Sequence, residues 1–295
     1  MSSRSRTNET SPPGGRPTVL YGGEATWLGS LGGVIQSASA HEFYSVDIDL
    51  RSSWLAPSWP AVASQLSRHM IRVRSVWLPG MLAGPLINQR TDRLMEFLRG
   101  CRRDHGLRTI VIPRAAHIRR GSSLGPLIRQ FASERSGPVP RVAVGVRAVD
   151  LGAERGHLDH LRSIRRLAEE WDLDVALDLT GKVPRDWEAE AAIMRLLPRL
   201  ALVRIAPELS EGLYRTPMGT RSMAARSIAI LADQGYTGPI SVASSVHPLR
   251  SLVTSSGAGE LEILAREAVL DQYDRQRRTT HQWDTAKRLI PPEVI

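Results

Sequence analysis

The chain has 295 residues, of which 42% are hydrophobic and 23% charged, and its formal net charge at pH 7 is +9. This length suits one large α/β barrel or two ordinary domains, and the apolar content is enough for a sizeable core. A single cysteine, Cys101, excludes an intramolecular disulfide and a thiolate metal cluster, and no apolar run reaches the ~20 residues of a membrane-spanning helix.

In chain order, a polar leader is followed by eight alternations of short β-branched runs and longer amphipathic runs. Residues 1–16 are rich in Ser, Arg, Thr, Pro and Gly without an apolar segment, so we expect a disordered leader rather than a secretory signal, and a cytoplasmic protein. The predicted strands are 18–21, 45–50, 71–78, 108–113, 141–147, 174–179, 201–205 and 240–243. The predicted helices are 30–42, 59–70, 89–105, 124–133, 157–171, 187–196, 220–234 and 260–277.

The eight strand–helix pairs across residues 17–277 predict a single (β/α)8 TIM barrel. The strand runs are nearly continuous apolar stretches, such as Val142-Ala143-Val144, which is typical of parallel strands covered on both faces. An open, doubly wound sheet usually has fewer strands and is the alternative. Cys101 follows Leu98 and Leu94 at helical spacing, which predicts a small core residue. Residues 278–295 are expected to form a C-terminal tail that packs outside the barrel or against a partner.

Three short segments resemble the xylose isomerase-like TIM barrel family, which includes sugar phosphate isomerases and epimerases and AP endonuclease family 2. Residues 230–242 (ILADQGYTGPISV) are similar to the family's passage from the last helix of the ring into strand eight. Residues 42–50 (EFYSVDIDL) are similar to its approach to strand two, and residues 178–182 (DLTGK) to its end of strand six. The resemblance covers about residues 18–277 and implies the same barrel.

The departures from this family fall on its metal ligands. Such barrels usually hold a divalent cation with Glu, Asp, His and Glu at the ends of several strands, and oxygen and imidazole ligands suit such an ion. Here strand five ends in Gly145-Val146-Arg147 without a carboxylate, and strand six keeps Asp178 but no following histidine. Strand seven has Arg204-Ile205-Ala206-Pro207, and Ala243 lies where the last glutamate would be. Against the resemblance, we therefore expect a degenerate site with no metal and no cofactor.

The active site of this fold lies at the C-terminal ends of the strands, where cations are unusually common. The residues predicted there are Glu24, Asp47, Asp49, Arg51, Trp77, Arg114, His117, Arg147, Asp178, Lys182, Arg204, Glu208, Ser244, Ser245 and His247. Strands four to seven would each contribute one cation, namely Arg114, Arg147, Lys182 and Arg204. These cations would replace the metal as the local positive charge and bind an anion, because the guanidinium fork pairs bidentately with phosphate or carboxylate.

The candidate acid–base groups at this end are Glu24, Asp178, His117 and His247. We take Glu24 and Asp178 as the catalytic candidates and the two histidines as ligand-binding candidates. The alternative for the charges is an internal ion-pair network, with Asp178 between Arg147 and Arg204 and with Asp49 or Glu24 nearby, because core-facing charges in a barrel must be paired. The alternative for the histidines is exposure on loops.

Three classes of function follow from these residues. The first is a sugar isomerase or epimerase-like protein that binds a small polar or anionic ligand, such as a sugar phosphate or carboxylate, without the family's metal. The second is a non-catalytic barrel that serves as a ligand-binding, regulatory or interaction scaffold, since fold does not fix function. The third is an AP endonuclease-like DNA-binding protein, which the basic charge favours and the missing zinc ligands disfavour.

The distribution of charge does not favour nucleic acid as a partner. Lysine occurs only at Lys182 and Lys287, and the arginines are spread over the whole chain, often beside acidic residues, as Arg165 is beside Glu169. A general preference for Arg explains this spread at least as well as a binding surface does. The expected partner is therefore a small anionic or sugar-like molecule, with no membrane, and a homo-oligomer is compatible with the sequence.

Overall fold

The computed structural model describes residues 15–24, 31–51, 56–79, 87–113, 139–147, 157–180, 189–205, 223–243 and 258–289, with residues 128, 130, 131, 133 and 134. Part of the segment that follows each of the eight strands lies outside these ranges. The described residues therefore define the barrel and the ends of its strands, and the site is built from those strand ends.

The eight strands form a closed, parallel barrel in chain order. They are β1 Val19–Glu24, β2 Ser45–Asp49, β3 Arg72–Trp77, β4 Thr109–Ile112, β5 Arg141–Arg147, β6 Asp174–Leu179, β7 Leu200–Ile205 and β8 Ile240–Ala243. The ring closes because β1 pairs with β2 on one side and with β8 on the other, with Tyr21 opposite Val46 and opposite Val242. The predicted (β/α)8 barrel is confirmed, and an open sheet is excluded.

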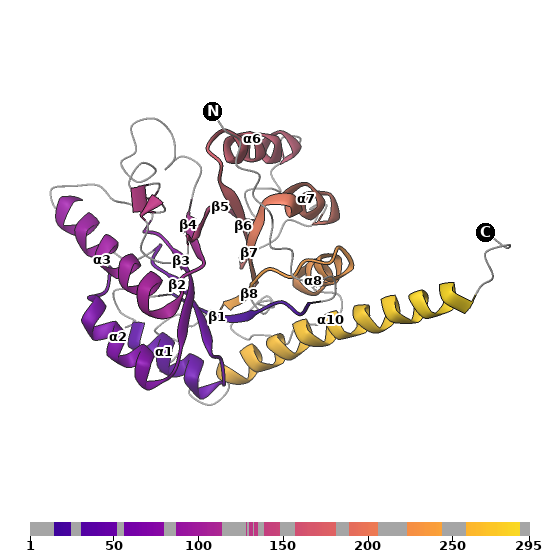
Figure 1. The fold of residues 1–295 in the computed structure, drawn as a ribbon, viewed down its shortest axis with the longest axis horizontal. Helices are drawn as coiled ribbons and strands as arrows, with labels where there is room; N and C mark the ends of the chain where they lie inside the picture. Colours follow the sequence, from indigo (N-terminus) through magenta and orange to yellow (C-terminus); the bar gives the residue numbers. More distant parts are fainter. Residues whose placement is uncertain are drawn as a thin grey trace, which may run out of the picture.

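Helices surround the barrel, with α1–α3 on one side and α6–α8 on the other (Figure 1). Their bounds are α1 Leu31–Ala40, α2 Trp59–Arg68, α3 Ile87–His105, α6 His157–Glu170, α7 Ala189–Leu196, α8 Met223–Asp233 and α10 Ala258–Leu289. In the predicted helix 124–133, residues 128, 130, 131 and 133 are helical. Each helix buries one apolar stripe against the strands, as α1 does with Leu31, Ile35 and Ala38.

Two apolar clusters form the core, because successive strand residues point to opposite faces of the sheet. The larger cluster lies between the strands and the helices and contains Ile48, Val76 and Cys101. Cys101 is fully buried, as the apolar stripe predicts, and burial raises the pKa of its thiol well above the usual value. The smaller cluster fills the inside of the barrel with Leu20, Trp77, Val111, Ala143, Ala176, Ala201 and Leu202.

The turn from α8 into β8 explains the sequence pattern of residues 230–242. Gly235 ends the helix at φ +67, a left-handed conformation that glycine adopts without strain. Tyr236 is buried, and its hydroxyl donates a hydrogen bond to the Pro239 carbonyl at 3.2 Å. A side chain on Gly238 would place its Cβ 2.4 Å from the Tyr236 hydroxyl oxygen, so glycine is required beside the tyrosine.

The helix α10 is longer than the predicted 260–277 and continues to Leu289, through much of the predicted tail. Ala265, Val269 and Tyr273 are buried, whereas residues 277–280 are all exposed. Figure 1 shows the later part of the helix extending away from the barrel. The helix continues because no Gly or Pro interrupts it until Pro291 and Pro292, and a proline disfavours helix in the residue before it. Among the described residues, no helix combines the length and apolarity needed to span a membrane.

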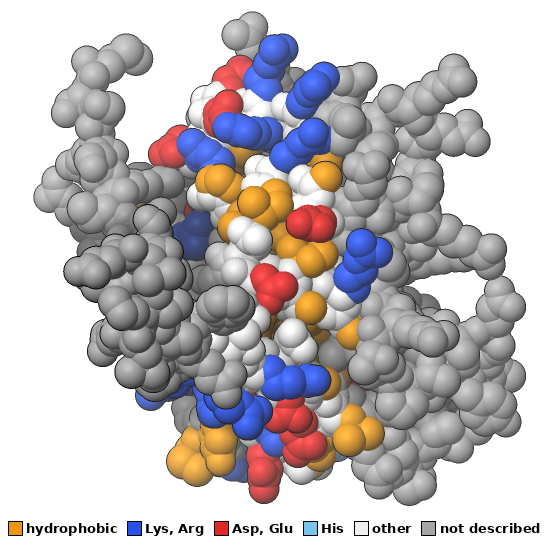
Figure 2. Space-filling view, turned by 90° about the vertical axis from the view of Figure 1, so that its right-hand side faces the viewer, with side chains coloured by type: hydrophobic (Ala, Val, Ile, Leu, Met, Phe, Trp, Pro, Cys, Tyr) orange, Lys and Arg blue, Asp and Glu red, His pale blue; other side chains and the backbone are white. Residues whose placement is uncertain are grey.

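The face formed by α6, α7 and α8 shows how the arginines are distributed on helices. Basic side chains gather toward α6 at the top of this face, with acidic side chains beside them (Figure 2). On α6, the Arg165 Nε lies 2.8 Å from the Glu169 Oε1, one turn further along the helix. Such exposed pairs contribute little to stability, but they agree with the predicted mixture of charges on helix faces.

Candidate functional site

Alternation along β2 places two carboxylates inside the barrel near its C-terminal end. Val46 and Ile48 belong to the core that faces the helices, so Asp47 and Asp49 face inward. Arg51 follows at the next alternate position, beyond the end of the strand. Three charged side chains from one strand therefore reach the same end of the barrel.

Asp49 binds two arginines, Arg51 and Arg204, that lie far apart in the sequence. The Arg51 guanidinium binds it with its Nε at 3.0 Å from both carboxylate oxygens and its Nη2 at 2.7 Å from Oδ2. The Arg204 Nη1, on β7, also donates to Asp49 Oδ2. Arg51 then reaches across to β6, where its Nη1 donates to Asp178 Oδ2. The result is a continuous chain of ion pairs across the barrel mouth.

The carboxylate of Asp178 is fixed by further donors from its own loop. The Thr180 hydroxyl donates to Asp178 Oδ1 at 2.6 Å, and the Thr180 backbone N–H donates to the same oxygen at 3.1 Å. Asp178 is therefore held by a neighbouring hydroxyl, a backbone amide and a guanidinium. These contacts restrict its orientation at the end of β6, as a positioned acid–base group requires.

Below this chain, Asp47 binds neutral donors from β3. It accepts hydrogen bonds from the Ser75 hydroxyl at 2.5 Å and from the Trp77 indole N–H at 3.2 Å. The Arg204 Nε lies 3.5 Å from Asp47 Oδ2, which is ion-pair range without a hydrogen bond. The Arg204 guanidinium therefore lies between Asp47 and Asp49 and forms an ion pair with each of them.

Trp77 forms an aromatic layer beneath the two guanidinium groups. The Arg51 Cζ lies 4.6 Å and the Arg204 Cζ 5.6 Å from the Trp77 ring centroid, which is cation–π range. The indole fills the inside of the barrel as far as β5, because a Cβ on Gly145 would come within 2.7 Å of its Cζ3 atom. Gly145 is the residue that leaves space for this ring.

We define the mouth network as Asp47, Asp49, Arg51, Asp178 and Arg204. Burial and neighbouring charges shift the pKa of four of these groups in opposing directions. Burial raises the pKa of Asp47, despite the opposing effects of Arg204 and Ser75. For Asp49, burial acts in the same direction but is outweighed by Arg204 and Arg51, which lower its pKa to about 2. Burial lowers the pKa of Arg51 and Arg204, but the neighbouring carboxylates outweigh it and raise both pKa values.

The structure brings together several of the residues predicted from strand ends. Register places Arg147, Asp178 and Arg204 on adjacent strands and Glu24 opposite Asp49. Glu24 has a described backbone only, and Arg147 is partly exposed. The remaining predicted site residues lie outside the described part of the chain: Arg114, His117, Lys182 and His247.

The sequence suggested an internal ion-pair network as the alternative to a ligand site. The structure contains such a network, but the residues are paired differently. Asp178 does lie between Arg147 and Arg204 in register, but the bond between Asp178 and a guanidinium comes from Arg51. Arg204 binds Asp49, on the far side of the ring, instead. Arg51 and Asp49 were among the residues expected at the mouth but were not selected as site residues. The signal for them was the alternation Asp47, Asp49, Arg51 along one strand.

The described carboxylates at this mouth are bound by guanidinium and hydroxyl groups. Within the part of the chain that the structure describes, no three His, Cys, Asp or Glu side chains are grouped as ligands. Asp178, which the resemblance described above implies as a ligand position, is bound by Arg51 and Thr180 and has Arg147 and Arg204 as strand neighbours. A divalent cation at this carboxylate would be repelled by the surrounding guanidinium groups.

Solved structures with the same barrel include sugar epimerases. No family model and no curated protein matches the sequence. The D-allulose 3-epimerase from Methylomonas sp., solved with D-allulose, is 17% identical at a TM-score of 0.54, over 88% of this chain and 99% of that chain. An L-ribulose 3-epimerase is 14% identical at a TM-score of 0.53, over 90% and 97% of the two chains. The AP endonuclease, family 2, from Brucella melitensis is 16% identical at a TM-score of 0.51, over 77% and 92%.

These identities establish the fold alone. The resemblance to xylose isomerase-like barrels, inferred from short segments of sequence, is confirmed at the level of the fold, because the chain has the same closed (β/α)8 barrel as these structures.

Proposed function

We propose that this protein is a divergent sugar isomerase or epimerase-like barrel that binds a small polar or anionic ligand, such as a sugar phosphate or carboxylate, at its C-terminal mouth and without a divalent metal. The observation that carries the proposal is the mouth network, in which four of five charged side chains are almost completely buried at strand ends. In this fold, that is the end where active sites are built.

The energetic cost of the network supports a functional role. Transfer of a charged group from water into a protein interior costs several kcal/mol even after relaxation, and apolar replacements of buried ion pairs are often as stable or more stable. A barrel interior that needed only stability is served by Leu, Val and Ile, as at Leu20 and Val111. Retention of charge at Asp49 and Arg204 therefore points to chemistry at the mouth.

Epimerisation beside a carbonyl needs a base that removes a proton and a positive charge that stabilises the resulting enediolate. We assign the acid–base roles to Asp178 and Glu24. For epimerisation, one carboxylate would take the proton from one face of the carbon and the other, in its protonated form, would deliver a proton to the opposite face; for isomerisation, the first would return its proton to the neighbouring carbon. Arg51, whose side chain is 25% exposed, and Arg147 would face the developing negative charge. Arg204 is a positioning residue, because its guanidinium holds Asp49. Arg114, Lys182, His117 and His247 stay as proposed ligand contacts from the loops.

The test measures binding and proton exchange separately. Isothermal titration with D-allulose, D-fructose 6-phosphate and gluconate measures binding, and proton NMR in heavy water follows deuterium incorporation next to the ketose carbonyl. We expect binding and exchange with the wild type, at least a hundredfold slower exchange in Asp178→Asn or Glu24→Gln, and unchanged exchange in the surface control Arg165→Gln. Absence of binding by all three probes overturns the proposal.

A second candidate function is a non-catalytic scaffold, and one observation favours it. Both described guanidinium groups of the mouth network are occupied by internal carboxylates, which leaves less charge for a ligand. If a probe binds but no deuterium enters it, the barrel is a ligand-binding scaffold rather than an enzyme. The same pair of measurements thus separates the two candidates.

A further inference from the structure

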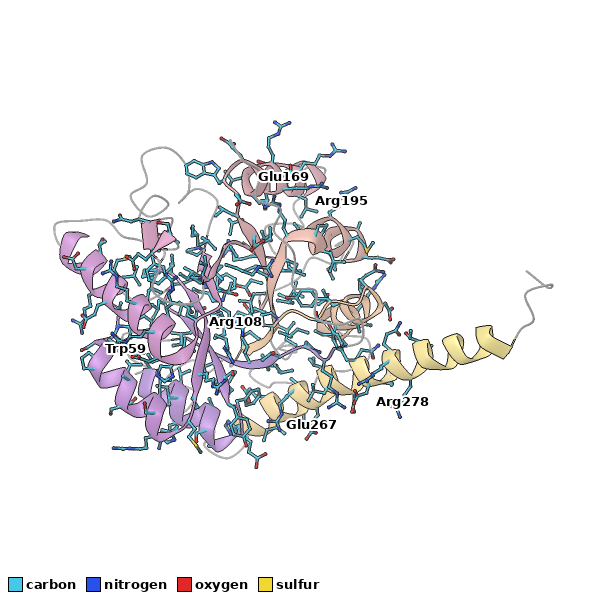
Figure 3. The ribbon with its side chains drawn as sticks, viewed as in Figure 1. Trp59, Arg108, Glu169, Arg195, Glu267 and Arg278 are labelled. Carbon is cyan, nitrogen blue, oxygen red and sulfur yellow. The ribbon has the colours of Figure 1, made fainter. Side chains whose placement is uncertain are left out.

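Three arginines gather at the opposite, N-terminal end of the barrel. Arg72 opens β3, Arg74 follows two residues later, and Arg108 immediately precedes β4. The Arg108 backbone N–H donates to the Arg74 carbonyl at 2.9 Å, so the two residues are neighbours across the strand pair. Arg72 and Arg108 are exposed and Arg74 is partly buried. We call these three residues the arginine cluster, and Figure 3 shows Arg108 between α1–α3 and α6–α8.

A β-bulge and a glycine turn fix the position of Arg74. The register between β2 and β3 passes from Val46 opposite Val73 to Asp47 opposite Ser75, which leaves Arg74 as the extra residue. Bulges change the direction of a side chain. The Arg74 Nη1 donates to the Gly106 carbonyl at 3.2 Å, and Gly106 adopts φ +63 in the turn between α3 and β4. The Arg74 side chain therefore extends to Gly106, in the turn that precedes Arg108.

The charges of the arginine cluster lack acidic partners among the described residues. Other arginines at this end have them, since the Arg141 Nε lies 2.7 Å from Asp174 Oδ2. No described carboxylate lies within 4.0 Å of the guanidinium nitrogens of the arginine cluster. Burial lowers the pKa of Arg74, and the charges of Arg108 and Arg72 lower it further, because each neighbouring cation opposes the charge on Arg74.

Stability does not account for such a cluster. The N-terminal end of a (β/α)8 barrel normally serves stability rather than catalysis, but like charges placed together oppose folding. A general preference for arginine accounts for isolated arginines on helices, some paired like Arg165 and Arg99 with carboxylates at 2.8 and 2.6 Å, but not for three that are close enough to oppose the charge on Arg74. A bound anion would remove the repulsion.

We propose that Arg72, Arg74 and Arg108 form a phosphate-binding site at the N-terminal end of the barrel, separate from the C-terminal mouth. Guanidinium groups suit phosphate because their planar fork donates two parallel hydrogen bonds to its oxygens. Tyr44 lies beside the site, since the Arg72 N–H donates to its carbonyl at 3.0 Å, and its side chain is 70% exposed. An exposed ring at this position suits a phosphate that carries a sugar or a base, either as a free ester or within a single-stranded nucleic acid.

The test compares three phosphate probes at constant ionic strength, with chloride as the reference anion. Inorganic phosphate, ribose 5-phosphate and fluorescein-labelled dT12 are titrated into the wild type and into the double variant Arg74→Gln/Arg108→Gln. We expect at least one probe to bind the wild type and to bind the double variant at least tenfold more weakly. The control Arg165→Gln/Arg278→Gln removes the same charge from exposed helix positions and keeps wild-type affinity.

Two further comparisons keep the result decisive. Arg147→Gln alters the mouth, so a loss of binding in this variant alone assigns the phosphate to the proposed sugar site and overturns the inference. In phosphate-free buffer the double variant should melt at or above the wild-type temperature, and a lower melting temperature makes the arginines structural and overturns it too. If the double variant does not fold, the single variant Arg108→Gln, at an exposed position, is compared with the wild type in probe affinity and melting temperature instead.

The source of the phosphate follows from which probe binds. Tight binding of dT12 that weakens with salt indicates a nucleic-acid backbone. Binding of ribose 5-phosphate without dT12 indicates a free ester. Failure of all three probes, with sugar binding at the mouth retained, overturns this site and leaves the proposed function intact.

Discussion

Among individual residues, Asp49 is the junction of the mouth network, because it accepts hydrogen bonds from both Arg51 and Arg204. Asp49→Asn would leave Arg204 buried without a full counter-charge, and loss of one partner of a buried pair costs about 3–5 kcal/mol. We expect the free energy of unfolding in urea to fall by that amount. The exposed pair partner Glu169→Gln is the control and should show no measurable loss. A loss below about 1 kcal/mol for Asp49→Asn would contradict the buried network.

The lowered pKa of Asp49 also predicts how stability depends on pH. Its pKa is about 2 in the folded protein, whereas an aspartate in an unfolded chain has the ordinary pKa of 3.8. The unfolded state therefore binds more protons between these values, and the stabilisation is present above pH 3.8 and is lost as pH falls toward 2. The shift corresponds to about 2 kcal/mol. Urea unfolding between pH 2 and 5 should show this slope in the wild type and a shallower one in Asp49→Asn.

Two of the five residues of this network, Asp178 and Arg204, were selected from the sequence as site residues, and the way in which the network is paired depends on closure of the barrel. Asp178 and Arg204 were selected because they end predicted strands, where a barrel places its active site. Their actual partners, Arg51 and Asp49, lie 127 and 155 residues away along the chain. No local spacing encodes such contacts, because they form only when β2 comes to face β6 and β7 across the ring.

Among the elements, α10 begins with a part that packs on the barrel and continues into a part that extends away from it. Among its described side chains, which end at residue 280, the last buried one is Tyr273, and residues 277–280 are exposed. We expect deletion of residues 278–295 to leave the urea unfolding midpoint of the barrel unchanged. Val269→Ala, within the buried part, should cost about 2 kcal/mol because it removes two buried methyl groups and leaves a cavity. A large loss on deletion would show that the extended part of α10 packs against the barrel.

The accuracy of the element predictions followed the strength of the physical signal. The strands at 141–147, 174–179 and 240–243 agree with the structure residue for residue, because apolar runs bounded by Gly, Pro or charged residues define parallel strands sharply. Helix α10 was cut short because its apolar periodicity ends at Tyr273, although its backbone does not. The absence of a helix breaker before Pro291 was the better guide to its end.

For the whole molecule, the two ends of the barrel handle charge in opposite ways. At the C-terminal mouth, three carboxylates and two arginines form ion pairs with one another inside the ring. At the N-terminal end, Arg72, Arg74 and Arg108 lie together without a described carboxylate within 4.0 Å, on a chain whose formal net charge is +9. Buried pairs are screened weakly by salt and exposed charges strongly. Added salt should therefore weaken the charge repulsion at the N-terminal end more than the ion pairs at the C-terminal mouth.

This difference predicts that sodium chloride stabilises the protein. Raising the salt from 0.1 to 1 M shortens the Debye length from about 10 to about 3 Å, which screens repulsion among exposed arginines and leaves the mouth network intact. A relief of ~1 kcal/mol would raise the melting temperature by roughly 2–4 °C in calorimetry. Two double variants, Arg74→Gln/Arg108→Gln and Arg165→Gln/Arg278→Gln, each lower the net charge by two. If salt raises the melting temperature less in Arg74→Gln/Arg108→Gln than in the other variant, the effect comes from the arginine cluster. An equal rise in both would assign it to net charge alone, and a fall would mean that exposed ion pairs dominate.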